Sequence, residues 1–255
     1  MRETNPSGRH VNFDPEKHRF IIEETGQTLV GATTFISGFF EKFDADKWAP
    51  RTAKKRGTTT EAILAEWAEK AKRGRDEGHN VHEYAEYRCL QEAGRFVDKE
   101  PAPMSDRCEL LFGWTDKAVN WLFKYYELVD VEQIIFSPRL NAAGIIDLVM
   151  RNEEGIFLFD WKQNREIKNY NPYQNGKGPL SHLQAHDLNK YALQLNVYKY
   201  ILVVEKYYPD ENIGHKLIHL TPDGYYPINL KNMQQEVYAM YKQSLGLFPD
   251  FNPPS

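Results

Sequence analysis

Three residues on two neighbouring segments have the types and spacing of a metal-dependent hydrolytic site. In AAGIIDLVM, side-chain alternation along a strand places Asp147 on the same face as Ile145 and Val149, so a carboxylate projects from an apolar strand. The segment IFLFDWK is apolar for four residues and then places Asp160 and Lys162 two apart, on one side of a strand. Two carboxylates and an amine are therefore expected to meet at one sheet edge.

Two explanations fit these three side chains. A salt bridge in which Lys162 neutralises Asp147 or Asp160 would be purely structural. Paired carboxylates beside a strand carbonyl would instead form an oxygen-rich site for Mg²⁺ or Mn²⁺, ions that polarise a phosphodiester and activate a water. A lysine beside such a site could position or deprotonate that water, or stabilise the charge of the transition state.

The wider sequence favours the second explanation. Four short motifs occur in one order along the chain: Gly78-x-x-x-His82, Gly144-x-x-Asp147, Asp160-Trp161-Lys162 and Gln194-x-x-x-Tyr198. As an ordered set they resemble the motif series of the RecB-like nucleases in the PD-(D/E)XK superfamily. The chain departs from that pattern in having Asp rather than the commoner Glu at position 160, and it lacks the cysteines that hold an iron-sulfur cluster in some relatives.

The resemblance implies a fold and a set of roles. A PD-(D/E)XK restriction-endonuclease-like core would span roughly residues 55–230 of a single domain, with a hairpin and helix at 18–50 and a helix at 231–247 as additions. The implied metal ligands are His82, Asp147, Asp160 and the main-chain carbonyl of Trp161. Lys162 would be the catalytic base or an electrostatic stabiliser. Gln194 and Tyr198 would organise the site and touch the DNA strand.

Three further residues are weaker candidates. Glu86, one helical turn after His82, and Glu132, on the first strand of the predicted meander, are interpreted as solvated or supporting acids rather than ligands. A zinc pair of His79 and His82 is disfavoured, because HNVHE lacks the HExxH arrangement. On its own, His82 would be an ordinary helix histidine, and its place in the motif series is what selects it.

Two segments combine positive charge with aromatic rings that could stack on bases. The loop KQNREIKNYNPYQNGKGP leaves the strand that carries Lys162, and its predicted substrate-binding residues are Arg165, Lys168, Tyr170, Tyr173 and Lys177. The tract RTAKKRG is the weaker candidate; its cations are Arg51, Lys54, Lys55 and Arg56. The alternative for the loop is a solvated segment without a binding role.

The elements predicted for the N-terminal half are mostly helical. Residues 18–36 indicate a hairpin that leads into a helix, followed by an aromatic helix at 39–49. A helix capped within Thr58–Thr60 is expected to break between Gly74 and Gly78. Another, TDKAVNWLFKYYELV, is expected to begin at Thr115.

The C-terminal half predicts a mixed sheet. Three β-like runs at 131–138, 142–150 and 155–163 indicate an antiparallel meander, and a polar stretch at 164–179 follows. A long helical pattern at 182–208 then precedes strands near 214–220 and 224–230. The sheet is expected to gain a strand through this crossover helix, which gives a mixed α/β fold flanked by helices.

Composition and charge exclude several classes of function for this chain. With 41% hydrophobic and 27% charged residues, the chain has an ordinary globular composition. Its two cysteines, Cys89 and Cys108, are too few for a four-cysteine metal site. A net charge of −4 excludes a general DNA-coating protein, so any nucleic-acid contact must come from a local groove. The polar N-terminus and the lack of a long apolar run disfavour secretion and a membrane partner. The resemblance then implies a cytoplasmic protein of a bacterial or phage-infected cell.

The expected function is a Mg²⁺- or Mn²⁺-dependent deoxyribonuclease, an exonuclease acting on ends or single strands in recombination, repair or phage DNA processing. The implied partners are DNA and a helicase or single-strand annealing protein, because no helicase segment is present. Two alternatives stay open. One is a structure-specific or restriction-type endonuclease, and the other is a noncatalytic DNA-binding module that keeps the fold.

Overall fold

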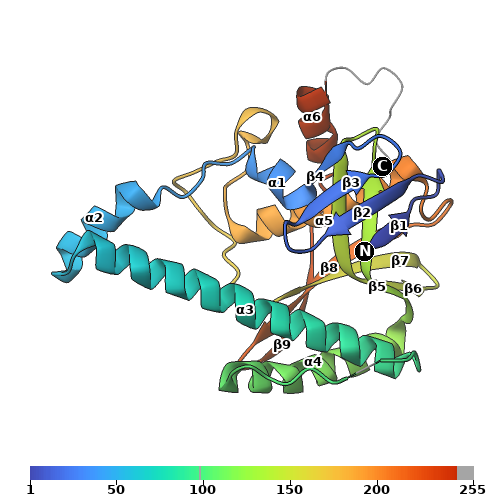
Figure 1. Cartoon of the computed structure of the whole chain (residues 1–255), viewed down its shortest axis with the longest axis horizontal. Helices are drawn as coiled ribbons and strands as arrows, with labels where there is room; N and C mark the ends of the chain where they lie inside the picture. The colour runs from blue at the N-terminus through green and yellow to red at the C-terminus, as the bar shows by residue number, and fades with distance from the viewer. Residues whose placement is uncertain (98, 246–255) are drawn as a thin grey trace.

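The computed structural model describes residues 1–97 and 99–245. Within them, nine strands form one mixed sheet with helices packed on it (Figure 1). The strand order is β1-β2-β3-β4-β6-β7-β8-β9, and β5 pairs with β6. The expected mixed α/β architecture, a central sheet flanked by helices, is confirmed.

The predicted antiparallel meander forms the centre of the sheet. Its strands are β5 (Glu127–Ser137), β6 (Ala142–Asn152) and β7 (Gly155–Lys162). Both β5 and β7 pair antiparallel with β6. The prediction of three strands is confirmed, although β5 begins at Glu127 rather than at residue 131.

Along the edge that faces β7, β6 is paired only in part. Its first two residues pair in parallel with β4 (Thr28–Gly31), and its last five, from Leu148 on, pair with β7. Residues 144–147 have no ladder partner on that edge among the described strands. The sheet therefore opens into a fork beside Asp147.

The crossover that follows β7 adds a parallel strand, as predicted. Helix α5 (Asp187–Glu205) connects β7 to β8 (Ile213–Thr221), which pairs in parallel with β7, and β9 (Gly224–Asn229) pairs antiparallel with β8. The helix begins at Asp187 instead of residue 182, because the imidazole of His186 caps it by accepting the N–H of Asn189.

Two helix predictions in the N-terminal half are wrong. Helix α3 (Thr60–Glu92) runs without the break expected between Gly74 and Gly78, and Thr59 caps its start as predicted. Helix α4 (Asp106–Tyr125) begins after Ser105 rather than at Thr115. Thr115 is buried inside α4, where its hydroxyl donates to the carbonyl of Leu111 at 2.9 Å, so its polar group is satisfied without capping a helix end.

The N-terminal segment contains more strand than expected. The strands β1 (Arg2–Thr4), β2 (His10–Asp14), β3 (Arg19–Ile22) and β4 precede helix α1 (Ala32–Ser37). The hairpin and helix predicted at 18–36 are confirmed. The helix predicted at 39–49 starts too early. Helix α2 (Ala45–Arg56) is capped by Asp44, whose carboxylate accepts the N–H of Lys47, and it continues to Arg56 in the basic tract.

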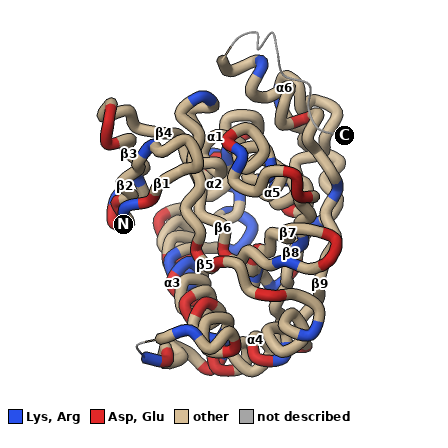
Figure 2. The backbone as a smooth tube through the Cα atoms, turned by 90° about the vertical axis from the view of Figure 1, so that its right-hand side faces the viewer, with Lys and Arg blue, Asp and Glu red and all other residues tan. Residues whose placement is uncertain are grey.

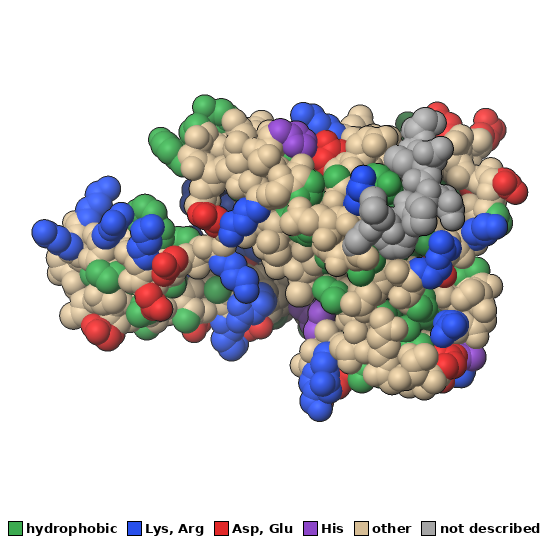
Figure 3. Space-filling view, turned by 90° about the horizontal axis from the view of Figure 1, so that it is seen from above, with side chains coloured by type: hydrophobic (Ala, Val, Ile, Leu, Met, Phe, Trp, Pro, Cys, Tyr) green, Lys and Arg blue, Asp and Glu red, His purple; other side chains and the backbone are tan. Residues whose placement is uncertain are grey.

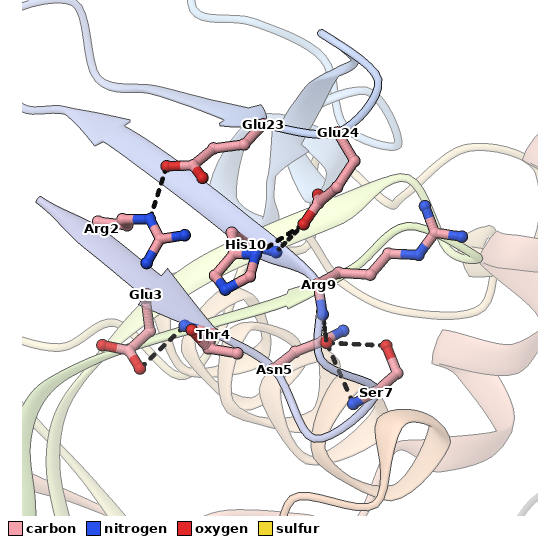
Figure 4. Close-up of polar contacts among 9 residues, drawn as sticks. All are labelled: Arg2, Glu3, Thr4, Asn5, Ser7, Arg9, His10, Glu23 and Glu24. Atoms are coloured by element: carbon pink, nitrogen blue, oxygen red, sulfur yellow. Dashed lines mark hydrogen bonds and ion pairs between the residues drawn. The ribbon is translucent and has the colours of Figure 1, made fainter.

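Polar contacts hold the first strands together (Figure 4). Arg2 donates to Glu23 at 2.8 Å, and the ring of His10 lies 2.7 Å from Glu24. The Asn5 carboxamide accepts the N–H of Ser7 in a turn, which orders the connection between β1 and β2. These contacts tie β1 to the hairpin that borders the cleft described below.

Apart from α2, the helices form two layers, one on each face of the sheet (Figure 2). Helices α1, α5 and α6 (Gln234–Leu245) share one apolar core with the sheet, and α3 and α4 share another. The predicted helix at 231–247 corresponds to α6, and its last two residues lie outside the described range. Among the described helices, none is both long and apolar enough to cross a membrane.

Candidate active site

A cleft of about 680 Å³ lies at the fork between β6 and β7. Helix α3 borders it with Gly78 and His82, and α5 borders it with Gln194 and Tyr198. The hairpin residue Phe20 completes the border on the N-terminal side. Because all four motifs of the sequence contribute to this one cleft, residues more than 100 positions apart share a single site.

Asp147 and His82 meet at the mouth of the fork. One carboxylate oxygen of Asp147 accepts the main-chain N–H of Trp161 at 2.9 Å and lies 3.3 Å from Nδ1 of His82. Nε2 of His82 lies 3.0 Å from the carbonyl of Trp161. Both ring nitrogens therefore face oxygen atoms that only accept hydrogen bonds, and three of the implied ligands are adjacent.

Glu132 belongs to the same cluster. One ligand atom from each of His82, Glu132 and Asp147 lies within 4.8 Å of the others. Burial, and then the neighbouring carboxylates of Asp147, Glu86 and Asp160, raise the pKa of Glu132 to about 8. Three like charges around a partly buried carboxylate disfavour its ionised form, which is the environment that a bound cation would relieve.

Two backbone features place Glu132 there. Its neighbours Val131 and Gln133 pair with Leu148 and Ile146, so Glu132 lies opposite Asp147 in the antiparallel ladder. Its φ of 46° is in the left-handed region, which a glutamate rarely adopts. No local sequence pattern reveals either feature, so the sequence alone predicts Glu132 only as a solvated or supporting acid.

Asp160 and Lys162 form an ion pair deeper in the cleft. The Asp160 side chain is buried, its Oδ2 faces the Lys162 ammonium, and its Oδ1 accepts the amide N–H of Gln194 at 3.1 Å. Burial raises the pKa of Asp160 even though Lys162 opposes that shift. The salt bridge considered as an alternative therefore exists, with Asp160 rather than Asp147 as the partner.

The charge state of Lys162 follows from the same contacts. Burial alone would lower the pKa of this amine, but the carboxylates of Asp160 and Asp147 outweigh that effect and raise it. The ammonium also lies 4.9 Å from the ring centre of Tyr191, a residue that sequence reasoning missed. Lys162 is therefore a fixed positive charge at neutral pH, suited to stabilising negative charge rather than accepting a proton.

Gly144 and Tyr198 explain how Gln194 is held. The amide of Gln194 also donates to the Tyr198 hydroxyl at 3.1 Å, and Tyr198 is buried. A Cβ atom at Gly144 would overlap the Tyr198 ring. Gly144 thus leaves room for Tyr198, which orients Gln194 toward Asp160. Any larger residue at position 144 would collide with the tyrosine ring, which explains the glycine in this motif.

The predicted substrate-binding residues of the loop do not line this cleft, although the first loop residues Gln163 and Asn164 do. The loop residues Arg165, Lys168, Tyr170, Tyr173 and Lys177 are all exposed, and none of them lines the cleft. Main-chain hydrogen bonds anchor the loop elsewhere: the N–H of Lys168 donates to Asp187, and that of Lys177 donates to the carbonyl of Phe39. Later residues of the loop line two separate pockets.

The zinc alternative gains no support from the geometry. His79 is exposed and contacts Glu83 at 3.1 Å on the surface of α3. It lies outside the cluster of His82, Glu132 and Asp147. Cys89 and Cys108 are buried as free thiols in the core beneath α3 and α4.

Comparisons with known proteins leave the family open. No family model matches the sequence, and no curated protein matches it. One solved structure, titled "Crystal structure of SSO0001", is 15% identical; the match covers 64% of this chain and 83% of that chain with a TM-score of 0.25. A TM-score this low carries no argument about fold or function.

Proposed function

We propose that this protein is a metal-dependent deoxyribonuclease with a RecB-like PD-(D/E)XK core. The observation that supports the proposal is the convergence of His82, Glu132 and Asp147 beside the Asp160–Lys162 pair in one cleft. These groups come from α3, β5, β6 and β7, so their meeting is a product of the fold rather than of local sequence.

The donor set fits Mg²⁺ or Mn²⁺. Carboxylate oxygens, a main-chain carbonyl and one imidazole are ligands that these ions accept. Within the described residues, Lys162 is the one cation in contact with Asp160, and burial together with the carboxylates of Asp147, Glu86 and Asp160 raises the pKa of Glu132. The raised pKa of Glu132 and the convergence of ligand atoms from His82, Glu132 and Asp147 favour a cation at this cluster, beside Asp160 and the Trp161 carbonyl.

The residues of the cleft would have different roles in the reaction. A bound divalent ion would polarise the scissile phosphate and lower the pKa of a water molecule. Lys162, held as a cation by Asp160, would stabilise negative charge that develops on the phosphate. Gln194 and Tyr198 would keep Asp160 oriented, and His82 would fix the Trp161 carbonyl on the cleft side of β7.

The mode of cleavage is proposed to be exonucleolytic, with DNA as substrate and a helicase or single-strand annealing protein as partner. A structure-specific or restriction-type endonuclease would use the same groups, whereas a noncatalytic module would not need a charged Lys162 in the cleft.

One digest tests the proposal and separates these outcomes. End-labelled linear DNA and covalently closed circular DNA are incubated with the protein and Mg²⁺, with EDTA as the control. We expect the linear DNA to shorten and the closed circle to persist. Cleavage of the circle would indicate the endonuclease, and intact DNA in both samples would contradict the nuclease proposal.

A further inference from the structure

The first part of α3, together with α2, forms an arm that projects from the body of the protein (Figure 1). We call residues 45–75 the α2–α3 arm. Its two helices meet through a small core of their own: Ala49, Ala53 and Ile63 are buried against each other, with Leu64 and Trp67 packed beside them. The arm is thus an ordered structure, although it lies outside the two main cores.

One face of α2 carries a stripe of cations. Lys47, Arg51 and Lys55 are spaced four residues apart, and Lys54 follows Arg51 by three, so the four side chains lie within an arc of about 100° around the helix axis. Ala49 and Ala53, which pack on α3, lie on the opposite face. The four cations are therefore held outward by the same packing that attaches α2 to the arm.

These cations are available to a ligand. All four side chains are exposed, and within residues 1–97 and 99–245 none of them forms an ion pair. Arg56, the next cation, is instead paired with Glu66 of α3 at 2.9 Å. Figure 3 shows basic side chains gathered on the projecting lobe.

An aromatic ring lies beside the stripe. The Trp48 side chain is 44% exposed, and the Arg51 guanidinium lies 5.1 Å from the centre of its ring. Exposed aromatic and guanidinium planes next to lysines are the combination that binds nucleic-acid strands. A polyanion that also offers stacking surfaces fits this patch better than a simple anion does.

The rest of the molecule makes such a patch necessary. The chain carries a net charge of −4, and the cleft is lined by Glu83, Glu86, Glu132, Asp147 and Asp160. Arg75 and Lys162 also line the cleft, but the five carboxylates outnumber them, so the metal-free cleft disfavours phosphate. A DNA substrate must therefore be held mainly by cations outside it.

The continuous helix α3 sets the distance between the arm and the cleft. At 1.5 Å per residue, Ile63 in the arm lies about 28 Å along the helix from His82. This distance corresponds to roughly eight base pairs at 3.4 Å each. Arg73 is exposed on the intervening surface and Arg75 lines the cleft, so cations continue between the two ends.

We infer that the α2–α3 arm binds the phosphate backbone of the DNA substrate roughly eight base pairs from the cleft. This inference rests on the proposed function, because it takes DNA as the polymer that the cleft cleaves. It adds a second contact surface, made by Lys47, Arg51, Lys54 and Lys55, to the site at the fork.

The test variant is Arg51→Gln/Lys54→Gln/Lys55→Gln. Glutamine keeps the helix propensity close to that of lysine and arginine, and the buried alanines of α2 are untouched. The matched control is Lys117→Gln/Lys124→Gln/Lys242→Gln, which removes three exposed cations from α4 and α6. Circular dichroism melting checks that both variants fold like the wild type.

Binding is measured by fluorescence anisotropy in EDTA, so that no cleavage occurs. For a duplex of about 30 base pairs in about 0.1 M salt, we expect the arm variant to bind at least roughly 10-fold more weakly than the wild type. The negative slope of log K, the DNA-binding constant, against log salt should be smaller in magnitude by roughly two to three in the arm variant than in the wild type.

Two results would overturn the inference. They are an unchanged affinity for the long duplex and an equal loss in the control variant. Wild-type cleavage in Mg²⁺ separates this inference from the proposed function. If DNA stays intact while the arm variant binds weakly, only the nuclease proposal fails; if DNA is cleaved while the arm variant binds normally, only the arm proposal fails.

Discussion

The main-chain N–H of Trp161 donates a 2.9 Å hydrogen bond to the side chain of Asp147, just beyond the last backbone pair between β6 and β7. At the fork, the Asp147 carboxylate thus accepts a hydrogen bond that a main-chain carbonyl of the neighbouring strand would otherwise accept. The same oxygen lies 3.3 Å from His82, so Asp147 has a structural contact and a proposed ligand role at once.

Asp147→Asn separates those two roles. The amide oxygen can still accept the Trp161 N–H, so we expect the free energy of unfolding to stay within about 1 kcal/mol of the wild type. Loss of the negative charge should weaken Mn²⁺ binding, measured by calorimetry, and reduce single-turnover cleavage by at least roughly 10²-fold. Metal-free DNA binding should tighten because repulsion of the phosphate is relieved. Wild-type cleavage in a folded Asp147→Asn protein would remove Asp147 from the metal site.

Lys162→Ala should affect both stability and cleavage. It leaves the buried Asp160 carboxylate without its counter-ion, a change that costs roughly 3–5 kcal/mol when one partner of a buried pair is removed. Cleavage per folded molecule should also fall by at least roughly 10²-fold, because a stabilising charge is lost. Calorimetry and single-turnover cleavage are run on the same samples. A folded fraction that keeps its specific activity would make Lys162 a structural counter-ion only.

The raised pKa of Glu132 predicts that the stability of the metal-free protein depends on pH. The Glu132 pKa of about 8 in the folded state exceeds the usual value of 4.5, so the folded state binds more protons between these values. The free energy of unfolding should therefore fall as the pH rises from about 5 to about 8. Calorimetry in EDTA measures this trend, and Glu132→Gln should flatten it and raise the melting temperature at pH 8.

The contribution of Glu132 can be checked against metal binding. Mn²⁺ added at pH 8 should stabilise the wild type more than Glu132→Gln, because the cation offsets the repulsion among the carboxylates. An identical pH profile in the variant would show that Glu132 does not titrate in this range.

Gly144→Ala tests the packing that orients Gln194. The new methyl group overlaps the ring of Tyr198, so we expect a loss of roughly 1–3 kcal/mol in stability and reduced cleavage. Gly113→Ala in α4 is the matched control, since its Cβ would have no neighbour within 4 Å and alanine favours a helix. Equal stability of the two variants, measured by urea unfolding, would contradict the proposed role of Gly144.

The residues within each element of the site could be predicted from local patterns. Alternation along β6 and β7 placed Asp147 on an apolar strand and Asp160 on the same side as Lys162, and helical spacing placed Gln194 near Tyr198. These patterns are local because the side-chain period of a strand or helix depends only on its own backbone. The order of the meander and the crossover helix followed from the same signals.

The extent of helices was harder to predict. The glycines at 74 and 78 indicated a break, yet α3 continues through both. Each glycine weakens a helix by about 1 kcal/mol, a cost that packing of α3 on the rest of the protein can offset. At Gly78 the missing side chain makes room for Gln163, a contact that no local pattern contains.

By itself, the sequence determined which residues on β6, β7 and α5 face the same way. The tertiary structure decided that β4 and β7 diverge beside Asp147, that Lys162 pairs with Asp160, and that Glu132 joins His82. Each of these outcomes depends on the register between strands, or on helices packed from distant parts of the chain. Register and packing depend on the combined burial of many side chains, which the period of one segment does not encode.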